Sequence, residues 1–354
     1  MILIYAFLFL ILGLSNSHAQ KNNQPIRIKT DLPIAEKWHF LNNSIGDKKI
    51  VCLGESLHGV KEYNATKVEL IQYLHEEMGF NVLAIESDLA MSFIGNLYRD
   101  SIPDSLFLEK IFTPVWHTEE HFELVQYLKA HPKLQLIGFD ITGKVPLTKI
   151  FQELNLTPDT TAPLIQDFIQ QYANFKDPYS PSNVYNLYIR DSVMAQISTW
   201  IIEQLYSNSK IILYGANPHL AKATALNSTN FMGAILAPQY PEEYYSIALF
   251  HSLGNPVHLW RDYYYVNEQQ LLPKNSLQYK LLKVKGDFLF LDIKQLQKKP
   301  SFKWLTTQID HIVATSKHYS TVHLAEAYDA LIWIKTVTHP TYIIDSPYHY
   351  HNQK

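Results

Sequence analysis

The stretch VCLGESLHGVKEYNATKVEL, residues 51–70, joins an apolar run to a group of titratable side chains that follows it directly. The run from Ile50 to Leu53 has the length and the branched side chains of a buried strand. Residues 67, 71, 74 and 78 then lie three and four positions apart, which is the spacing of one helix face. We therefore predict a strand followed by a helix, with Glu55 and His58 in the turn between them.

Short apolar runs of this kind recur along the chain, and segments with helical periodicity lie between them. The runs cover residues 50–53, 82–85, 134–139, 211–214, 244–250 and 288–291. Strands that alternate with helices favour βαβ units, in which neighbouring strands are parallel. The sequence therefore predicts an α/β fold with a mainly parallel sheet flanked by helices.

Residues 144–190 interrupt this alternation. They contain five prolines and no strand-like run, and their amphipathic part, residues 164–172, has helical spacing. A long segment without a strand between two βα units is typical of an insertion near a binding site. We expect a helical insertion over the C-terminal edge of the sheet, acting either as a lid or as a buttress.

The composition excludes some classes of partner. The chain has 354 residues, 47% of them hydrophobic, and a formal net charge of −3. This is enough apolar material for a large core. A near-neutral chain lacks the basic surface that nucleic acids and anionic membranes require. We therefore expect no nucleic-acid partner, and the sequence leaves the oligomeric state open.

The N-terminus has the pattern of an export signal. Residues 1–14 are almost wholly apolar, and a polar run at 15–17 and Ala19 follow them. The apolar run is shorter than the roughly 20 residues that span a bilayer, which favours a cleaved signal peptide over residues 1–19 rather than an anchor. The mature chain, residues 20–354, is then expected to be periplasmic or secreted, with no membrane span.

Polar or ionisable side chains follow four of the predicted strands. The positions are Glu55 and His58, Glu86 and Asp88, Asp140, and Asn217 with His219. The carboxyl ends of parallel strands share one crevice, and ligands bind there. Strands generally leave a protein core through polar residues, so one polar residue at a strand end is weak evidence for a binding site. Four in succession predict a shared site.

Lys67 lies on the apolar face of the first predicted helix. An ammonium group that is buried without a partner is costly, so we expect a carboxylate beside it, with Glu55 and Glu86 as the candidates. The alternative is that Lys67 lies at the rim of the core and extends to solvent.

The segments GESLHGVKEY at 54–63 and GFNVLAIESD at 79–88 resemble the opening signature of the erythromycin esterase family. Further likeness lies in Trp116 with Glu119 and Glu120, GFD at 138–140, RDSVMA at 190–195, GANPHLAKA at 215–223, MGAILAPQYPEEYYSIAL at 232–249, and YDALIWIKTVT at 328–338. The resemblance covers nearly all of residues 20–354. It implies one erythromycin esterase-like α/β domain, and a hydrolase that opens a macrolide lactone or another ester without a bound metal or cofactor.

The resemblance also implies roles for single residues. It makes His58 the catalytic base, Glu55 and Glu86 its supporting acids, and His219 a second active-site histidine. We expect substrate contacts from Glu62, Lys67, Asp88, Asp140, Asn217 and Arg190.

Two positions depart from the family pattern. Ala216 stands where the family has the first histidine of His-Asn-x-His, and Lys67 stands where an arginine is usual. Lysine keeps the positive charge but loses the planar bidentate fork of arginine.

The residue types favour attack by water. The turn lacks the G-x-S-x-G pattern of a nucleophile elbow, so Ser56 is not the expected nucleophile. A neutral imidazole at 58 suits the removal of a proton from water if a glutamate holds its other nitrogen. His219 and Lys67 would then polarise the ester carbonyl.

Two other functions fit parts of the sequence. HTEEH at 117–121 matches the H-x-x-E-H pattern of some zinc hydrolases, with His117 and His121 as ligands and Glu120 as base. The departures at 67 and 216 also fit a catalytically impaired binding protein on an enzyme scaffold.

Overall fold

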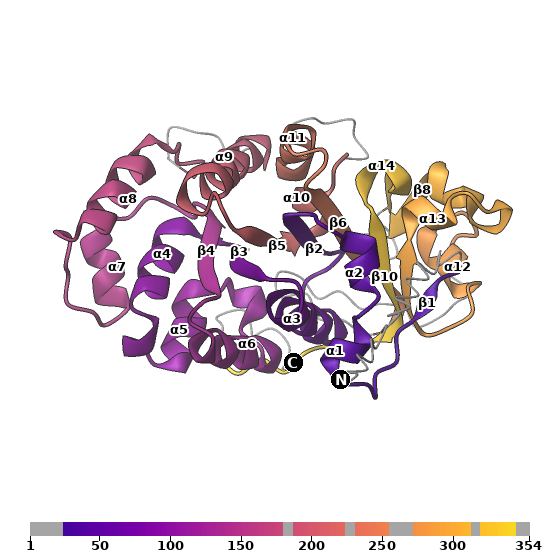
Figure 1. The fold of residues 1–354 in the computed structure, drawn as a ribbon, viewed down its shortest axis with the longest axis horizontal. Helices are drawn as coiled ribbons and strands as arrows, with labels where there is room; N and C mark the ends of the chain where they lie inside the picture. Colours follow the sequence, from indigo (N-terminus) through magenta and orange to yellow (C-terminus); the bar gives the residue numbers. More distant parts are fainter. Residues whose placement is uncertain (1–23, 180–186, 224–230, 255–271, 313–318, 345–354) are drawn as a thin grey trace, which may run out of the picture.

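The computed structural model describes residues 24–179, 187–223, 231–254, 272–312 and 319–344 (Figure 1). The predicted signal peptide, residues 1–19, lies outside the described residues. Within these ranges, no helix has the length and apolar character needed to cross a bilayer.

An eight-stranded sheet runs through the centre of the molecule in the order β1-β7-β10-β6-β2-β5-β3-β4 (Figure 1). Its strands are β1 (Ile26–Arg27), β2 (Ile50–Glu55), β3 (Phe80–Asp88), β4 (Gln135–Asp140), β5 (Lys210–Ala216), β6 (Tyr244–Gly254), β7 (Phe288–Asp292) and β10 (Ala330–Val337). The six strands from β10 to β4 are all parallel to one another. The predicted mainly parallel sheet is therefore confirmed.

Each predicted apolar run forms a strand, and the reason is burial on both faces. All six residues of β2 are buried, for example, and so is nearly all of β6. Strands covered by helices on both sides need continuous apolar runs rather than alternating ones. The prediction omitted β10, and it gave no direction for β7, which pairs antiparallel with both β10 and β1.

Helices surround the sheet. They are α1 (Ile34–Lys37), α2 (Leu41–Ile45), α3 (Lys61–Glu76), α4 (Leu89–Leu97), α5 (Asp104–Ile111), α6 (Glu119–Ala130), α7 (Leu147–Glu153), α8 (Pro163–Asn174), α9 (Leu187–Trp200), α10 (Asn217–Leu220), α11 (Met232–Gln239), α12 (Leu277–Leu282), α13 (Ile293–Leu296) and α14 (Leu324–Ala327). Figure 1 shows α3 and α6 on one side of the sheet and α9 and α11 on the other.

Each end of the sheet carries an additional group of elements (Figure 1). Helices α7 and α8, which fall within residues 144–190, lie beyond β4. The ring of Phe168 on α8 stacks on Phe93 of α4, with 3.9 Å between ring centroids. At the β7 end, a two-stranded antiparallel sheet of β8 (Gln308–Ile312) and β9 (Tyr319–His323) packs with α12 and α14, and α13 contacts α14.

Side chains of α4 occupy the outer edge of β4. The backbone amide of Leu136 donates to Asn96 Oδ1 at 2.9 Å, and the amide of Gly138 donates to Ser92 Oγ. At the opposite edge, β1 contributes only two residues. Two amides of β4 that face away from the sheet thus have partners within the molecule.

Candidate active site

The turn between β2 and α3 places a carboxylate between a histidine and a lysine. Glu55 Oε1 lies 2.5 Å from His58 Nδ1 and accepts a hydrogen bond from Trp116 Nε1 at 3.1 Å. Its other oxygen, Oε2, forms an ion pair with Lys67 Nζ at 2.5 Å. Because an ionised carboxylate only accepts hydrogen bonds, this contact assigns the proton of the His58 ring to Nδ1.

The expected partner of Lys67 is confirmed as Glu55. The Lys67 side chain is fully buried, and Glu55 is 1% exposed. The ammonium group also lies 3.5 Å from the centre of the Tyr214 ring, in a cation–π contact. Burial alone would raise the pKa of Glu55, but Lys67 and His58 outweigh it and lower that pKa to about 2. Glu55 is therefore ionised at neutral pH.

A second charged cluster forms around Glu86, at the end of β3. Arg190 Nη2 donates to Glu86 Oε1 at 2.9 Å and to Asp140 Oδ2 at 2.7 Å. Its Nε also donates to Asp140, at 2.9 Å. His219 Nε2 lies 3.3 Å from Glu86 Oε1, and the Ala216 amide donates to Glu86 Oε2 at 2.9 Å. Arg190 thus joins the ends of two strands, β3 and β4.

Asp191 completes this cluster. Its Oδ1 lies 2.7 Å from His219 Nδ1 and accepts the backbone amide of Met232 at 3.0 Å. Burial would lower the pKa of His219, but Glu86 and Asp191 together raise it to about 10. Burial would likewise raise the pKa of Glu86, and His219 and Arg190 hold it well below its ordinary value. His219 is therefore a cation at neutral pH.

A cavity of about 490 Å³ opens between the two clusters. The described residues that line it are His58, Glu86, Thr113, Pro114, Val115, Trp116, Asp140, Thr142, Tyr179 and Arg190. His58 exposes 23% of its side chain, whereas its partner Glu55 lies behind it. Cavities of this size bind small molecules, and this one presents an imidazole and a guanidinium to its contents.

The structure thus brings together several residues that the sequence placed at four strand ends. His58, Glu86 and Asp140 line the cavity, and Arg190 joins two of them. His219 reaches the same cluster through Glu86. Lys67 is expected to contact the substrate on sequence grounds, yet it lies behind Glu55 and does not reach the cavity wall.

Three other predicted substrate contacts also point elsewhere. Glu62 accepts hydrogen bonds at 2.8 Å from both the backbone amide and the hydroxyl of Thr338. Asp88 caps the N-terminus of α4 with one oxygen, and its other oxygen accepts from Thr142. Asn217 donates to a backbone carbonyl of β6, and its side chain packs so closely on Gly54 that a Cβ there would lie 2.3 Å from Oδ1. These contacts stabilise the folded structure.

Two residues of the site were missed by the sequence reasoning. Asp191 follows no strand; its signal was its position next to Arg190 in the RDSVMA segment. Trp116 was noted only for the family resemblance, although its indole donates to Glu55 and its ring meets that of His58 edge to face, at 5.8 Å between centroids.

The histidines of the HTEEH segment face different partners. His117 Nε2 contacts the carbonyl of Phe112, and His121 contacts the Tyr214 hydroxyl through Nε2 and Thr118 through Nδ1. Both are buried, and burial lowers the pKa of each. In the part of the chain that the structure describes, no three His, Cys, Asp or Glu side chains gather as ligands for a metal ion.

Comparisons with known proteins show likeness in sequence and in fold. The chain is 25% identical to the Bacillus subtilis protein named "Putative hydrolase YbfO", over 86% of this chain and 87% of that protein. The fold is similar to that of a Bacillus cereus protein of known structure, with a TM-score of 0.69, 20% identity, and 91% and 97% of the two chains covered. It is also similar to a mutant of the erythromycin esterase EreC in its open conformation, with a TM-score of 0.59, 15% identity, and 91% and 99% covered.

A family model described as erythromycin esterase matches residues 159–337, which is half of the chain. The match includes Arg190, Asp191 and His219, and the other charged cluster lies before it in the sequence. The chain belongs to the erythromycin esterase family.

Proposed function

We propose that the protein is a hydrolase that cleaves a carboxylic ester or lactone with a water molecule activated by His58. The observation that carries this proposal is the buried Lys67–Glu55 ion pair, which holds Nδ1 of a histidine on the wall of a 490 Å³ cavity. Family membership and the likeness to a protein named as a hydrolase support the reaction class.

The Glu55 cluster supplies the base. With Nδ1–H donated to Glu55, the other ring nitrogen, Nε2, carries the lone pair that accepts a proton from water. The resulting imidazolium lies against a carboxylate that remains ionised, because Lys67 keeps the pKa of Glu55 near 2. Lys67 therefore acts through Glu55 and makes no contact with the substrate.

The Glu86 cluster supplies positive charge for the transition state. Water attack on the carbonyl carbon creates an oxyanion, and preorganised cations close to it lower the barrier. Arg190 lines the cavity, and its Nη1 lies 3.4 Å from Nε2 of His219, which is itself cationic. The carboxylates of Glu86 and Asp140 hold the guanidinium in place. We assign oxyanion stabilisation to Arg190, with His219 as its neighbouring charge.

The sequence of steps needs no covalent intermediate. The water oxygen bonds to the carbonyl carbon while His58 takes one proton; the carbon–oxygen bond to the leaving group then breaks, and His58 returns the proton to the alkoxide. The Ser56 hydroxyl lies 3.0 Å from the Tyr63 hydroxyl, and Cys52 is fully buried, with its thiol pKa raised by burial. We therefore expect no burst of released alcohol in rapid-mixing experiments.

The test compares His58→Asn with the wild type on a panel of macrolides and simple activated esters. Asparagine keeps a hydrogen-bonding group near Glu55 but cannot take up the proton, so turnover should fall by about 10²- to 10⁴-fold. His39→Asn, at an exposed histidine, is the matched control and should retain full activity. Turnover by His58→Asn within a few-fold of the wild type would remove His58 as the base.

The absence of the family histidine at 216 favours a second candidate, a binding protein on the same scaffold. In that case the purified protein would bind a macrolide or ester without converting any of the panel. The same screen separates the two functions, because calorimetric binding without turnover supports the second and excludes the first.

We also propose that the protein is exported, with cleavage after residue 19. The apolar N-terminal run supports this location. N-terminal sequencing of the protein recovered from a periplasmic fraction or from the medium should give Gln20 as the first residue. Recovery only from the cytoplasm with Met1 intact would contradict it.

A further inference from the structure

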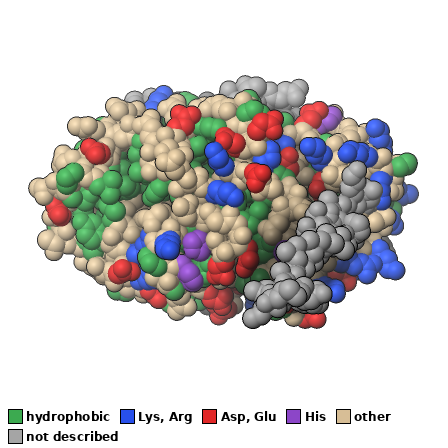
Figure 2. Space-filling model, viewed as in Figure 1, with side chains coloured by type: hydrophobic (Ala, Val, Ile, Leu, Met, Phe, Trp, Pro, Cys, Tyr) green, Lys and Arg blue, Asp and Glu red, His purple; other side chains and the backbone are tan. Residues whose placement is uncertain are grey.

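The β7 end of the molecule carries a net positive charge, whereas the whole chain carries a net negative charge. Residues 272–312 carry eight lysines against three aspartates, although the complete chain has a net charge of −3. Arg27 on β1 joins this region because β1 pairs with β7. Figure 2 shows Lys and Arg side chains gathered at the end of the molecule where Figure 1 places β1, β8 and α12. The whole-chain charge thus conceals a local basic surface.

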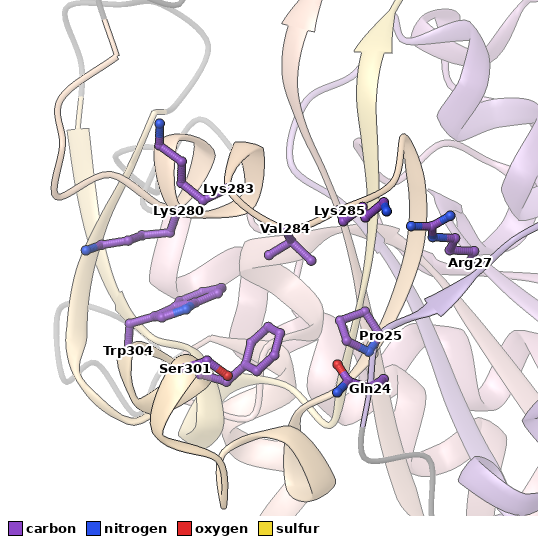
Figure 3. A pocket seen from close by; sticks show the side chains of 10 residues that line it. Gln24, Pro25, Arg27, Lys280, Lys283, Val284, Lys285, Ser301 and Trp304 are labelled. Atoms are coloured by element: carbon purple, nitrogen blue, oxygen red, sulfur yellow. The ribbon is translucent and has the colours of Figure 1, made fainter.

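This basic end contains a cavity of about 600 Å³, which shares no lining residue with the cavity beside His58 (Figure 3). Four cations line it: Arg27, Lys280, Lys283 and Lys285. None of its described lining residues is acidic. The ion pairs among the described residues include none of these four cations.

Figure 3 shows the charged ends of Arg27 and Lys285 turned toward each other on one side of the cavity. Two like charges in a concave site repel each other and raise the local concentration of anions. A bound anion would offset this repulsion, and the planar guanidinium beside an ammonium group suits phosphate, sulfate or carboxylate oxygens.

Four apolar or aromatic residues also line the cavity. Trp304 and Phe302 lie with 6.1 Å between ring centroids, and Val284 and Pro25 line the same space. Trp304 is only partly buried, so part of its indole remains exposed to a ligand. Aromatic side chains of this kind pack against flat rings. The site therefore combines an anion-binding side with a ring-binding side.

We propose that this cavity binds a small molecule in which a phosphate, sulfate or carboxylate group is attached to a flat apolar ring. The volume is within the range of small-ligand sites, which combine an apolar wall with a few polar groups. The proposal does not depend on the reaction at His58, because the two cavities have separate walls.

Phenyl phosphate is the probe, titrated into the full-length protein by isothermal calorimetry at low salt. It should bind more tightly than inorganic phosphate, which lacks the ring, and more tightly than phenol, which lacks the charge. Added salt should weaken binding, because the contacts are near the surface. Failure of phenyl phosphate to bind at millimolar concentration, or affinity no better than that of inorganic phosphate, would overturn the proposal.

Variants locate the site. Arg27→Gln with Lys285→Gln should weaken the binding of phenyl phosphate about tenfold, which is about 1.4 kcal/mol shared between two exposed charge contacts. Trp304→Ala should reduce the affinity to that of inorganic phosphate. The matched control is Lys294→Gln with Lys298→Gln, which removes the same charge from exposed positions outside the cavity lining. Equal weakening by the control would show that diffuse charge, and not this cavity, attracts the anion.

Two further measurements make these variants interpretable. Thermal unfolding should be unchanged in the Arg27/Lys285 variant, since both side chains are exposed. Turnover of any ester accepted by the wild type should also be unchanged. Binding that survives this double substitution but disappears in Arg190→Gln would place the anion in the cavity beside His58 and refute the inference.

Discussion

Replacing Lys67 by methionine tests the arrangement on which the proposed base depends. Methionine has a similar length and no charge, so the substitution leaves the Glu55 carboxylate buried without its cation. The lowering of the Glu55 pKa from 4.5 to about 2 corresponds to about 3 kcal/mol of net stabilisation of the ionised form. Removal of one partner from a buried pair typically costs about 3 to 5 kcal/mol. We expect Lys67→Met to lose free energy of unfolding in this range at pH 7.

The assay is urea unfolding followed by tryptophan fluorescence, at pH values from 7 down to 3. In the wild type, the folded pKa of Glu55 is below its unfolded value, so its contribution is present above pH 4.5 and is lost as the pH falls toward 2. In Lys67→Met the pKa of Glu55 rises, and protonation then relieves the penalty. The difference in unfolding free energy between the two proteins should therefore narrow as the pH falls.

Two controls accompany this prediction. Lys61→Met, at the exposed start of the same helix, should change stability by no more than about 0.5 kcal/mol. The double variant Lys67→Met with Glu55→Gln removes both charges and should recover most of the lost stability. A loss below about 1 kcal/mol in Lys67→Met, or no recovery in the double variant, would refute the claim that the ion pair is buried and mutually dependent.

Two further substitutions test the surroundings of the site. Asp191→Asn should cost about 2 kcal/mol of unfolding free energy, because it weakens a charged hydrogen bond to His219. The His219 pKa, about 10 in the wild type, should fall. Stability from a raised histidine pKa is complete below pH 6.5 and is lost toward pH 10, so the stability measured by urea unfolding should decline at a lower alkaline pH in the variant. Glu62→Ala should cost about 1 to 2 kcal/mol through the loss of two hydrogen bonds from Thr338 and leave turnover per folded molecule unchanged. Reduced turnover with unaltered stability would instead place Glu62 in the substrate site.

Much of the fold could be predicted because buried parallel strands need continuous apolar runs, and those runs are visible in the sequence. Strand β10 has the same character in ALIWIKTV at 330–337 and could have been recognised by the same rule. The direction of β7 could not, since residues 288–292 carry the same apolar run whichever way the strand points.

Some residues of the site could likewise be predicted from the sequence, and others could not. Residues at strand ends, such as Glu55, Glu86 and Asp140, were predictable because topology carries them to one crevice. The sequence did not predict which of the neighbouring polar side chains point into the cavity. Asp88 and Asn217 follow the same strands, but Asp88 caps a helix and Asn217 donates to a backbone carbonyl. These choices depend on side-chain directions that no sequence spacing specifies.

The hydrogen bonds from β4 to α4 have a consequence for the behaviour of the protein at high concentration. An open sheet usually offers its last strand as a template onto which another polypeptide can add, and this is a route to aggregation. Here Ser92 and Asn96 already accept hydrogen bonds from two outward amides of β4, and the opposite margin ends in the two-residue strand β1. Growth of the sheet from one molecule into the next is therefore disfavoured at both margins, whatever other surfaces bring copies together.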